Sequence, residues 1–266
     1  MGIRTRMILA ALAMSIAIPA HAVGRWTDAT DLWWNSGQSG WGVNVTQQND
    51  VLFLTFFVYG PNLNPVWYSA SDVRLQATTN GVLVYTGALY ETHGSWLADN
   101  FYDPAALIYR QVGTVMFRLN SIGSATLIYS VDGLTIQKQL TRFTWRTNEL
   151  AGSYLGAIAG DYFGCVSSFS NGYAEEGGLR YVLTQTSTNL AIQATGGSAT
   201  CVYSGTYVQE GRMGSMKGAY TCTNGTFGTF EASEIEANPQ VFSAKVTTLT
   251  NVCNFSGRIG GLRRSN

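Results

Sequence analysis

The sequence predicts an all-β protein made of two consecutive small antiparallel β-barrel or β-sandwich domains that follow a signal peptide. Turn-forming residues separate runs of β-branched and aromatic residues along the whole chain, which has 30 glycines but only 5 prolines. No segment has the 3.6-residue apolar period of an amphipathic helix. All 7 tryptophans lie between residues 26 and 145 and all 4 cysteines between residues 165 and 253, which indicates two domains stabilised in different ways.

The first 22 residues are typical of a secretory signal peptide. Arg4 and Arg6 precede an apolar run from Met7 to Ile18, and residues 20–22 (AHA) form a small-residue cleavage site. The apolar run is shorter than the about 20 residues that a membrane-spanning helix needs. We therefore expect a mature chain that begins near Val23 and is secreted or periplasmic, with no transmembrane segment after cleavage.

The expected mature chain is nearly neutral. Without Arg4 and Arg6 it has 14 basic and 16 acidic side chains, and charged residues make up only 12% of the sequence. Nucleic acids and anionic lipid surfaces are bound by strongly basic faces. The composition therefore argues against both as partners.

The first domain is expected over residues 23–147, and one of its hairpins follows directly from the sequence. The dipeptide at residues 132–133 (DG) is a strong type I′ turn signal. Closing the chain on it opposes Val131 with Leu134 and, further along, Ala125 with Leu140. One face of this hairpin is then mostly apolar and the other mostly polar, as in an antiparallel sheet with one buried face.

Residues 51–58 form a predicted strand of another kind. Their sequence, VLFLTFFV, is apolar on both faces of an extended chain. We expect one face to meet the barrel core and the other to be covered by the second domain or by another subunit. The alternative is a strand that is simply buried.

The second domain is expected over residues 148–266 and contains the cysteines. A turn at residues 210–213 would place Cys201 directly opposite Cys222, at a separation suited to a disulfide, and would leave Cys165 to join Cys253. Four cysteines allow three pairings, so this pairing is a preference. Each half offers roughly eight short strands joined by small turns, which favours up-and-down barrels.

Several short motifs in the first half resemble those of a known group of proteins. They are DLWWN at residues 31–35, SGWGVN at 39–44, FFVY at 56–59, PVWY at 65–68, YTGALY at 85–90 and VGTVMF at 112–117. Over about residues 30–145 the chain is similar to a module of secreted proteobacterial proteins with an LWWN…SGWG signature. The resemblance implies an accessory role and carries over no functional residue, because the module has no established activity. The second half, with CVYSGTY at 201–207, resembles other uncharacterised exported β-domains.

The tryptophans of the first domain are the best candidates for a binding site. Aromatic faces beside amide side chains suit a neutral glycan or a small planar or apolar ligand. The candidate ligand-binding residues are Trp33, Trp34, Asn35, Trp41, Asn44 and Trp67. The alternative is structural, since filling a core is the default use of so large an apolar side chain.

Catalytic and metal chemistry have little support. Glu234 and Glu236 are two residues apart on a predicted strand, so both are expected on one face, as a pair of glycosidase carboxylates would need. Carboxylates of this kind are usually solvated surface charges. The mature chain has one histidine, His93, and no C-x-x-C, and neither Asp28–Asp31 nor Asp99–Asp103 matches a calcium-binding loop. We expect no cofactor and no metal.

Two classes of function remain, with a third behind them. The first is an exported non-catalytic binding protein that holds a neutral glycan or small apolar ligand through the Trp-rich domain. The second is a protein–protein interaction module, such as an inhibitor or a surface-assembly subunit, which the strand at residues 51–58 favours. The third is a hydrolase that uses Glu234 and Glu236.

Overall fold

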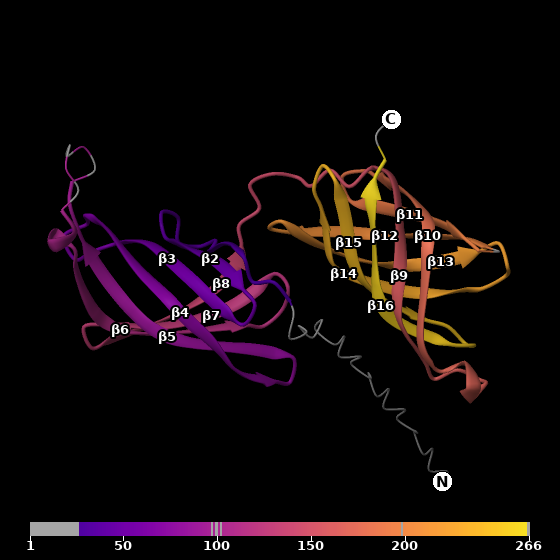
Figure 1. The fold of residues 1–266 in the computed structure, drawn as a ribbon, viewed down its shortest axis with the longest axis horizontal. Coiled ribbons are helices and arrows are strands. Elements are labelled where there is room, and N and C mark those ends of the chain that lie inside the picture. The colour runs from indigo at the N-terminus through magenta and orange to yellow at the C-terminus, as the bar shows by residue number, and fades with distance from the viewer. Residues whose placement is uncertain (1–26, 97, 99–100, 102, 198, 265–266) are drawn as a thin grey trace, which may run out of the picture.

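The computed structural model describes residues 27–96, 98, 101, 103–197 and 199–264, which form two closed antiparallel barrels (Figure 1). Each barrel has eight strands in the described part of the chain, and the predicted all-β fold is confirmed. The predicted signal peptide at residues 1–22 lies outside the described residues. Within the described ranges, no helix is long and apolar enough to cross a membrane.

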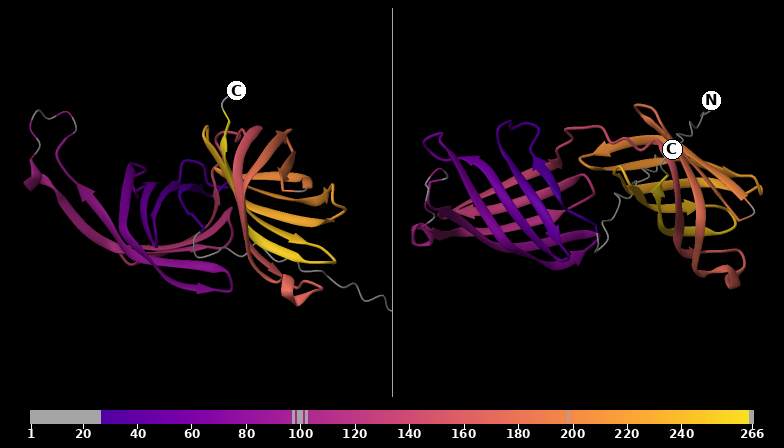
Figure 2. Two further views of the ribbon diagram at one scale, coloured as in Figure 1. Left: turned by 45° about the vertical axis from the view of Figure 1, so that its right-hand side comes forward. Right: turned by 45° about the horizontal axis from the view of Figure 1, so that its top comes forward.

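The first barrel runs up and down in chain order, and its last strand closes on its first. Its strands are β1 (Asp31–Trp34), β2 (Gly42–Gln48), β3 (Val51–Tyr59), β4 (Pro65–Thr79), β5 (Val82–His93), β6 (Ile108–Leu119), β7 (Ser124–Val131) and β8 (Leu134–Arg142), with a 3₁₀ turn η1 at Pro104–Ala106. The predicted hairpin is confirmed, because Val131 opposes Leu134 and Ala125 opposes Leu140. The β5–β6 hairpin extends beyond the other strands on the side away from the second barrel (Figure 2).

Alternation along β3 explains the core of the first barrel and corrects one expectation. Leu52, Leu54 and Phe56 point inward and are fully buried. On the outer face, Phe53 is 45% exposed and Phe57 is 53% exposed. The expectation that the second domain covers the outer face of residues 51–58 is therefore wrong.

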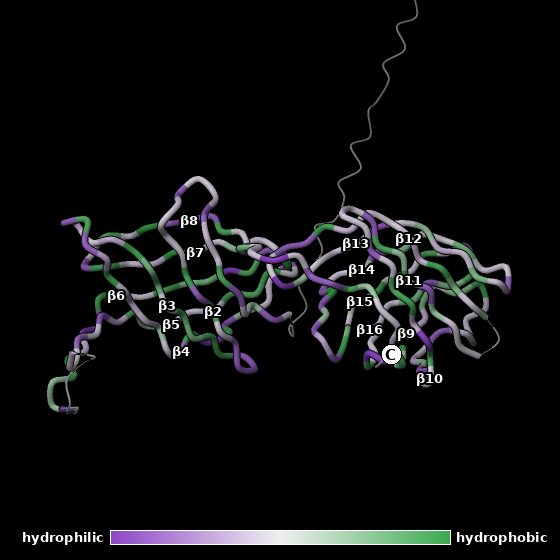
Figure 3. Tube along the Cα trace, turned by 90° about the horizontal axis from the view of Figure 1, so that it is seen from above, coloured by the Kyte–Doolittle hydropathy of each residue, from purple (hydrophilic) through white to green (hydrophobic). Residues whose placement is uncertain are grey.

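The second barrel is also an up-and-down barrel, closed by pairing of β9 with β16. Its strands are β9 (Gly152–Phe163), β10 (Gly172–Gln185), β11 (Asn189–Gly196), β12 (Ala199–Glu210), β13 (Met213–Cys222), β14 (Phe227–Ala237), β15 (Val241–Leu249) and β16 (Asn254–Arg263), with a 3₁₀ turn η2 at Ser168–Ser170. Glu210 opposes Met213, as the predicted turn requires. Apolar and polar residues alternate along the strands of both barrels (Figure 3), which is the pattern that a closed sheet with a filled interior needs.

The two barrels meet where the turn between β12 and β13 reaches the end of the first barrel. The backbone N–H of Gly211 donates to the Thr144 hydroxyl at 2.8 Å, and the N–H of Arg212 donates to the Asp31 carboxylate at 3.0 Å. The Arg212 guanidinium also pairs with Asp28. The connecting residues 143–151, which contain the predicted domain boundary after residue 147, lie between β8 and β9.

Candidate functional site

A cavity of about 210 Å³ lies inside the second barrel. It is lined by inward-facing residues from strands β9 to β16. Apolar side chains such as Ile158, Ile192 and Ile259 form much of its surface. Cys201 and Cys222, near the ends of β12 and β13 that lie opposite the turn touching the first barrel, also line it. The cavity therefore lies toward the end of the second barrel that points away from the first.

Glycines on the inner face of this barrel let its strands approach one another closely. Inward-facing positions on five strands carry glycine, each two residues from another inward-facing residue: Gly160, Gly205, Gly218, Gly228 and Gly257. Gly205 directly opposes Gly218, and Gly160 opposes Gly257. A Cβ on Gly205 would lie 2.0 Å from the carbonyl oxygen of Lys217. These positions need glycine because a Cβ at each would meet a neighbouring backbone atom, and none of the five glycines lines the cavity.

The interior of the first barrel is filled by large side chains. Trp33, Phe56, Tyr85 and Phe117 are fully buried in its interior, and the Trp33 and Phe117 rings meet edge to face at 5.5 Å. Large side chains at these interior positions fill the space inside the first barrel. The geometry therefore favours the second barrel as the place for an internal ligand.

Both disulfides lie beside the cavity. Cys201 bonds to Cys222 across the β12–β13 pair, and Cys165 bonds to Cys253, so the preferred pairing is confirmed. The second bond ties the loop after β9 to the loop before β16, and Cys253 itself lines the cavity. The two bonds therefore tie together four strand-end segments, at β9, β12, β13 and β16, beside the cavity.

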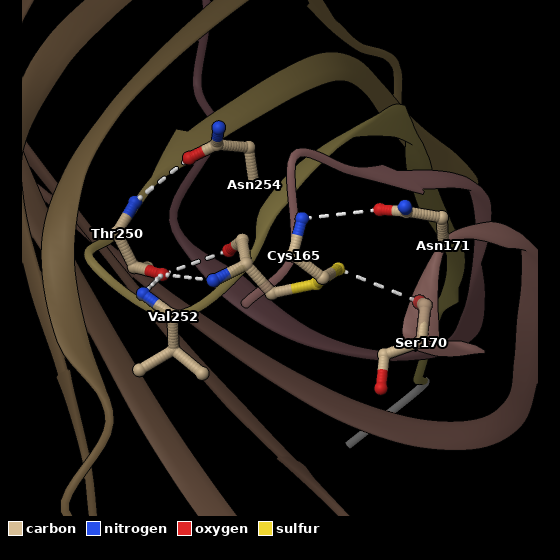
Figure 4. The surroundings of a disulfide bond; sticks show 7 residues. Cys165, Ser170, Asn171, Thr250, Val252 and Asn254 are labelled. Carbon is tan, nitrogen blue, oxygen red and sulfur yellow. Dashed lines mark hydrogen bonds between the residues drawn. A yellow bond between two sulfur atoms is a disulfide. The ribbon is translucent and has the colours of Figure 1, made fainter. Parts of the chain in front are cut away.

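Hydrogen bonds hold the loops on either side of the Cys165–Cys253 bond (Figure 4). The Cys165 N–H donates to the Asn171 side chain at 3.1 Å. On the other loop, the Thr250 hydroxyl accepts the N–H groups of Val252 at 3.0 Å and of Cys253 at 2.8 Å. The disulfide therefore joins two loops that are each ordered by their own side chains.

Aromatic side chains that pack against one another form one part of the cavity wall. The Tyr203 and Tyr220 rings stack with centroids 4.8 Å apart, and Phe230 meets Tyr203 edge to face at 5.2 Å. Nearer the end of β9, Tyr162 packs against Phe255 at 5.2 Å. These rings give a ligand both flat apolar faces and phenol hydroxyls.

The phenols of Tyr203 and Tyr220 are neutral at physiological pH. Burial, with smaller contributions from Tyr220 and Tyr162, raises the pKa of Tyr203 to about 12. Burial also raises the pKa of Tyr220, although a hydrogen bond with Thr248 acts in the opposite direction. None of the residues that line the cavity is Asp, Glu, Lys or Arg. The site therefore offers hydrogen bonds and apolar contact without charge.

The structure places the first three predicted ligand-binding residues in different surroundings. Trp33 is 1% exposed, and its indole N–H donates to the Ala29 carbonyl at 2.9 Å inside the first barrel. Trp34 is half-buried and packs edge to face on Phe143. Asn35 donates to the Gln139 carbonyl of β8, and its side-chain oxygen accepts the N–H of Gly37 in the turn after β1. Trp33 thus has the packing role that the sequence left open as the alternative.

The other three predicted residues lie elsewhere on the first barrel. Trp41 is half-buried and packs against the core. Asn44 and Trp67 both face outward, and Trp67 is 59% exposed and directly opposes Phe57. The structure brings Asn44 and Trp67 to one outer face but does not bring all six residues into one site.

The glutamates considered for catalysis are paired with arginines. Glu234 is 7% exposed, pairs with Arg258 and accepts a hydrogen bond from the Thr27 hydroxyl at 2.7 Å. Glu236 pairs with Arg212. Glu234 has a φ of 51° at a β-bulge, which breaks the alternation behind the expected shared face. In the described part of the chain, no group of three or more His, Cys, Asp or Glu residues is arranged to hold a metal ion.

Sequence reasoning missed the cavity, although a signal for it was present. Residues 201–207 (CVYSGTY) place Cys201, Tyr203, Gly205 and Tyr207 on one face of β12. Tyrosine at alternate positions of a barrel strand indicates an aromatic interior with hydroxyl groups. Comparison with models of known families, with curated proteins and with solved structures finds no significant match to this chain.

Proposed function

We propose that this chain is an exported, non-catalytic binding protein whose second barrel holds one small, uncharged ligand. The observation that carries the proposal is the cavity of about 210 Å³ with apolar walls, phenol hydroxyls and no charged lining residue. Binding pockets are typically concave and mostly apolar, with a few polar groups that orient the ligand. Export is supported by the predicted signal peptide and by two disulfides, which persist in oxidising compartments.

The size of the cavity limits the ligand. An apolar protein cavity of about 150 Å³ holds benzene. A cavity of about 210 Å³ therefore suits a substituted single ring or a small fused ring such as indole. The stacked pair of Tyr203 and Tyr220 favours a flat ring, and the hydroxyls of Tyr203, Tyr220 and Thr248 favour one polar substituent.

The test is a titration of the mature chain, from residue 23 onward, with ¹³C-labelled isoleucine methyl groups. Toluene, p-cresol and indole serve as neutral probes, and benzoate serves as a charged probe of similar size. We expect saturable shifts at Ile158, Ile192 and Ile259, which line the cavity, for the neutral probes only. The isoleucines of the first barrel, such as Ile128, provide the internal reference.

Two matched variants make the test specific. Ala194 lines the cavity, whereas Ala219 lies on the exposed outer face of β13. Ala194→Phe should fill the cavity and abolish the shifts, and Ala219→Phe should leave them unchanged. The proposal fails if no neutral probe shifts the three isoleucines at millimolar concentration, or if Ala194→Phe binds as tightly as the wild type.

A further inference from the structure

The outer face of the first barrel carries an exposed aromatic group that the proposed cavity does not use. Phe57 and Trp67 directly oppose each other on β3 and β4, and they are 53% and 59% exposed. Gly42 opposes Phe57 on the other side and adds no side chain. Gly42, Phe57 and Trp67 thus form an aromatic platform across β2, β3 and β4.

A groove of about 200 Å³ continues this platform at the ends of the same strands. Tyr59, which is 59% exposed, lines it together with Phe57, Trp67 and Gly40. Gly40 has a φ of 84°, and a Cβ at this position would lie 3.4 Å from the Tyr59 ring. The glycine of the SGWG motif therefore supports a turn that packs against the ring of Tyr59.

A row of uncharged polar side chains lies beside the aromatic platform. Asn44, Thr55 and Ser69 oppose one another across β2, β3 and β4, on the same outer face as Phe57 and Trp67. Each is half-buried, and none of the three side chains makes a hydrogen bond with another residue that the structure describes. Amide and hydroxyl groups are thus available beside two exposed rings.

The face carries no charge in its central part. The outward positions are 42, 44 and 46 on β2, 53, 55, 57 and 59 on β3, and 65, 67 and 69 on β4. None of them is Asp, Glu, Lys or Arg. A partner that is recognised through ionic contacts, such as a nucleic acid or a phosphorylated group, would find no counter-charge here.

The area of the face argues for a ligand with a small footprint. Three strands about 4.8 Å apart, followed for six residues at about 3.4 Å each, cover roughly 300 Å². A stable protein–protein interface buries about 800 Å² on each partner. A partner that needs such an area would have to extend well beyond the neutral aromatic face.

We infer that this face binds a neutral glycan, with Phe57, Tyr59 and Trp67 stacking on sugar rings and Asn44, Thr55 and Ser69 hydrogen-bonding to hydroxyls. Sugars combine apolar C–H faces with hydroxyl groups and, when neutral, bring no charge. These properties match the aromatic residues and the uncharged polar residues of this face. The site is independent of the cavity in the second barrel. It gives Asn44 and Trp67, but not Trp33, a place in ligand binding.

The experiment is native affinity electrophoresis of the mature protein in gels that contain hydroxyethyl cellulose, laminarin, galactomannan or soluble starch. We expect retardation by at least one polysaccharide and a loss of affinity of about tenfold or more in Trp67→Ala. Trp145→Ala is the matched control, because Trp145 is 74% exposed but lies after β8, outside the three strands of this face. Ala194→Phe should keep full retardation, which separates this site from the cavity.

Three outcomes would overturn the inference. The first is migration that none of the four polysaccharides retards. The second is equal retardation of the wild type and Trp67→Ala. The third is a wild-type dimer by light scattering that becomes a monomer in Trp67→Ala, which would assign the face to contact between two copies of the chain.

Discussion

Tyr203 and Tyr220 stack with their ring planes 17° apart, on neighbouring strands and at directly opposed positions of the second barrel. Both rings line the cavity of the second barrel. The stack holds both rings in one orientation and thereby fixes where their hydroxyls lie. This stacked pair can therefore contact a flat ring of a ligand and hydrogen-bond to its polar substituent.

Removing the Tyr203 hydroxyl should change the ligand selectivity of the cavity without changing the shape of the cavity. Tyr203→Phe keeps the stack but removes one hydrogen-bonding group, so affinity for p-cresol should fall about fivefold, near 1 kcal/mol, while affinity for toluene stays the same. The isoleucine methyl titration measures both affinities. Tyr173→Phe, at an exposed tyrosine of β10, is the control. Equal losses for both probes would show that the hydroxyl does not contact the ligand.

Glu210 should make the stability of the chain depend on pH. Burial raises the pKa of Glu210, and the charge of Arg142 offsets this only in part. A raised folded-state pKa means that the folded protein holds this proton more tightly than the unfolded chain. The stabilisation is complete below the ordinary glutamate pKa and is lost as the pH rises through the folded-state value.

The variant Glu210→Gln tests this dependence, because the amide does not titrate. At pH 7 the variant should be at least as stable as the wild type, and its advantage should shrink as the pH falls toward the ordinary glutamate range. Urea unfolding at a series of pH values gives the difference. Glu149→Gln, at an exposed position, should show no such trend. A constant difference between Glu210→Gln and the wild type would contradict the assignment.

Arg142 should be essential to the first barrel. Its guanidinium is buried, lies 4.6 Å from the Trp33 ring and donates to the carbonyl of Thr30 at 3.0 Å and to the carboxylate of Asp31 at 3.2 Å. Arg142→Met would leave the buried Asp31 without this partner, and such losses cost about 3–5 kcal/mol.

Tryptophan fluorescence reports this loss without a signal from the second barrel, because all 7 tryptophans precede that barrel, which begins at Gly152. Adding Asp31→Asn to Arg142→Met should recover part of the stability, since it removes the unpaired charge. Arg146→Met, at an exposed position, is the control. A loss below about 1 kcal/mol, the range of surface ion pairs, would contradict the expectation.

The two disulfides should differ in their effect on the second barrel. The Cys165–Cys253 bond spans 88 residues and the Cys201–Cys222 bond 21. In the chain-entropy description, their removal costs about 4.6 and about 3.3 kcal/mol, respectively. Urea unfolding of Cys165→Ala/Cys253→Ala and Cys201→Ala/Cys222→Ala, followed by the signals of Ile158, Ile192 and Ile259, compares them. A larger cost for the shorter loop would point to packing in the cavity wall as the main contribution.

Strand pairing was predictable wherever a local chemical signal set the register. The DG turn at residues 132–133 places Val131 opposite Leu134, and the preferred disulfide places Cys201 opposite Cys222. Both predictions are confirmed residue by residue. In each case the information lies within about 20 residues, so it does not depend on how the barrel closes.

The candidate site was not predictable in the same way. A cavity depends on which interior positions of eight strands lie at one level, and this stagger is set only when the barrel closes. Trp33 and Trp67 are the same residue type, yet one is buried and the other exposed. The bulge at Glu234 likewise has no sequence signal, since a positive φ at a glutamate is uncommon.

The short closure of the first barrel affects where local unfolding of this protein begins. β1 and β8 share two residue pairs, whereas β9 and β16 share ten. Local opening begins where the fewest backbone hydrogen bonds must break, so amide hydrogens of β1 should exchange with solvent well before those of β9. An opened first barrel presents two unpaired strand edges, and the same strands of a second molecule can pair with them. The seam between β1 and β8 is therefore the place where strand exchange between copies would start.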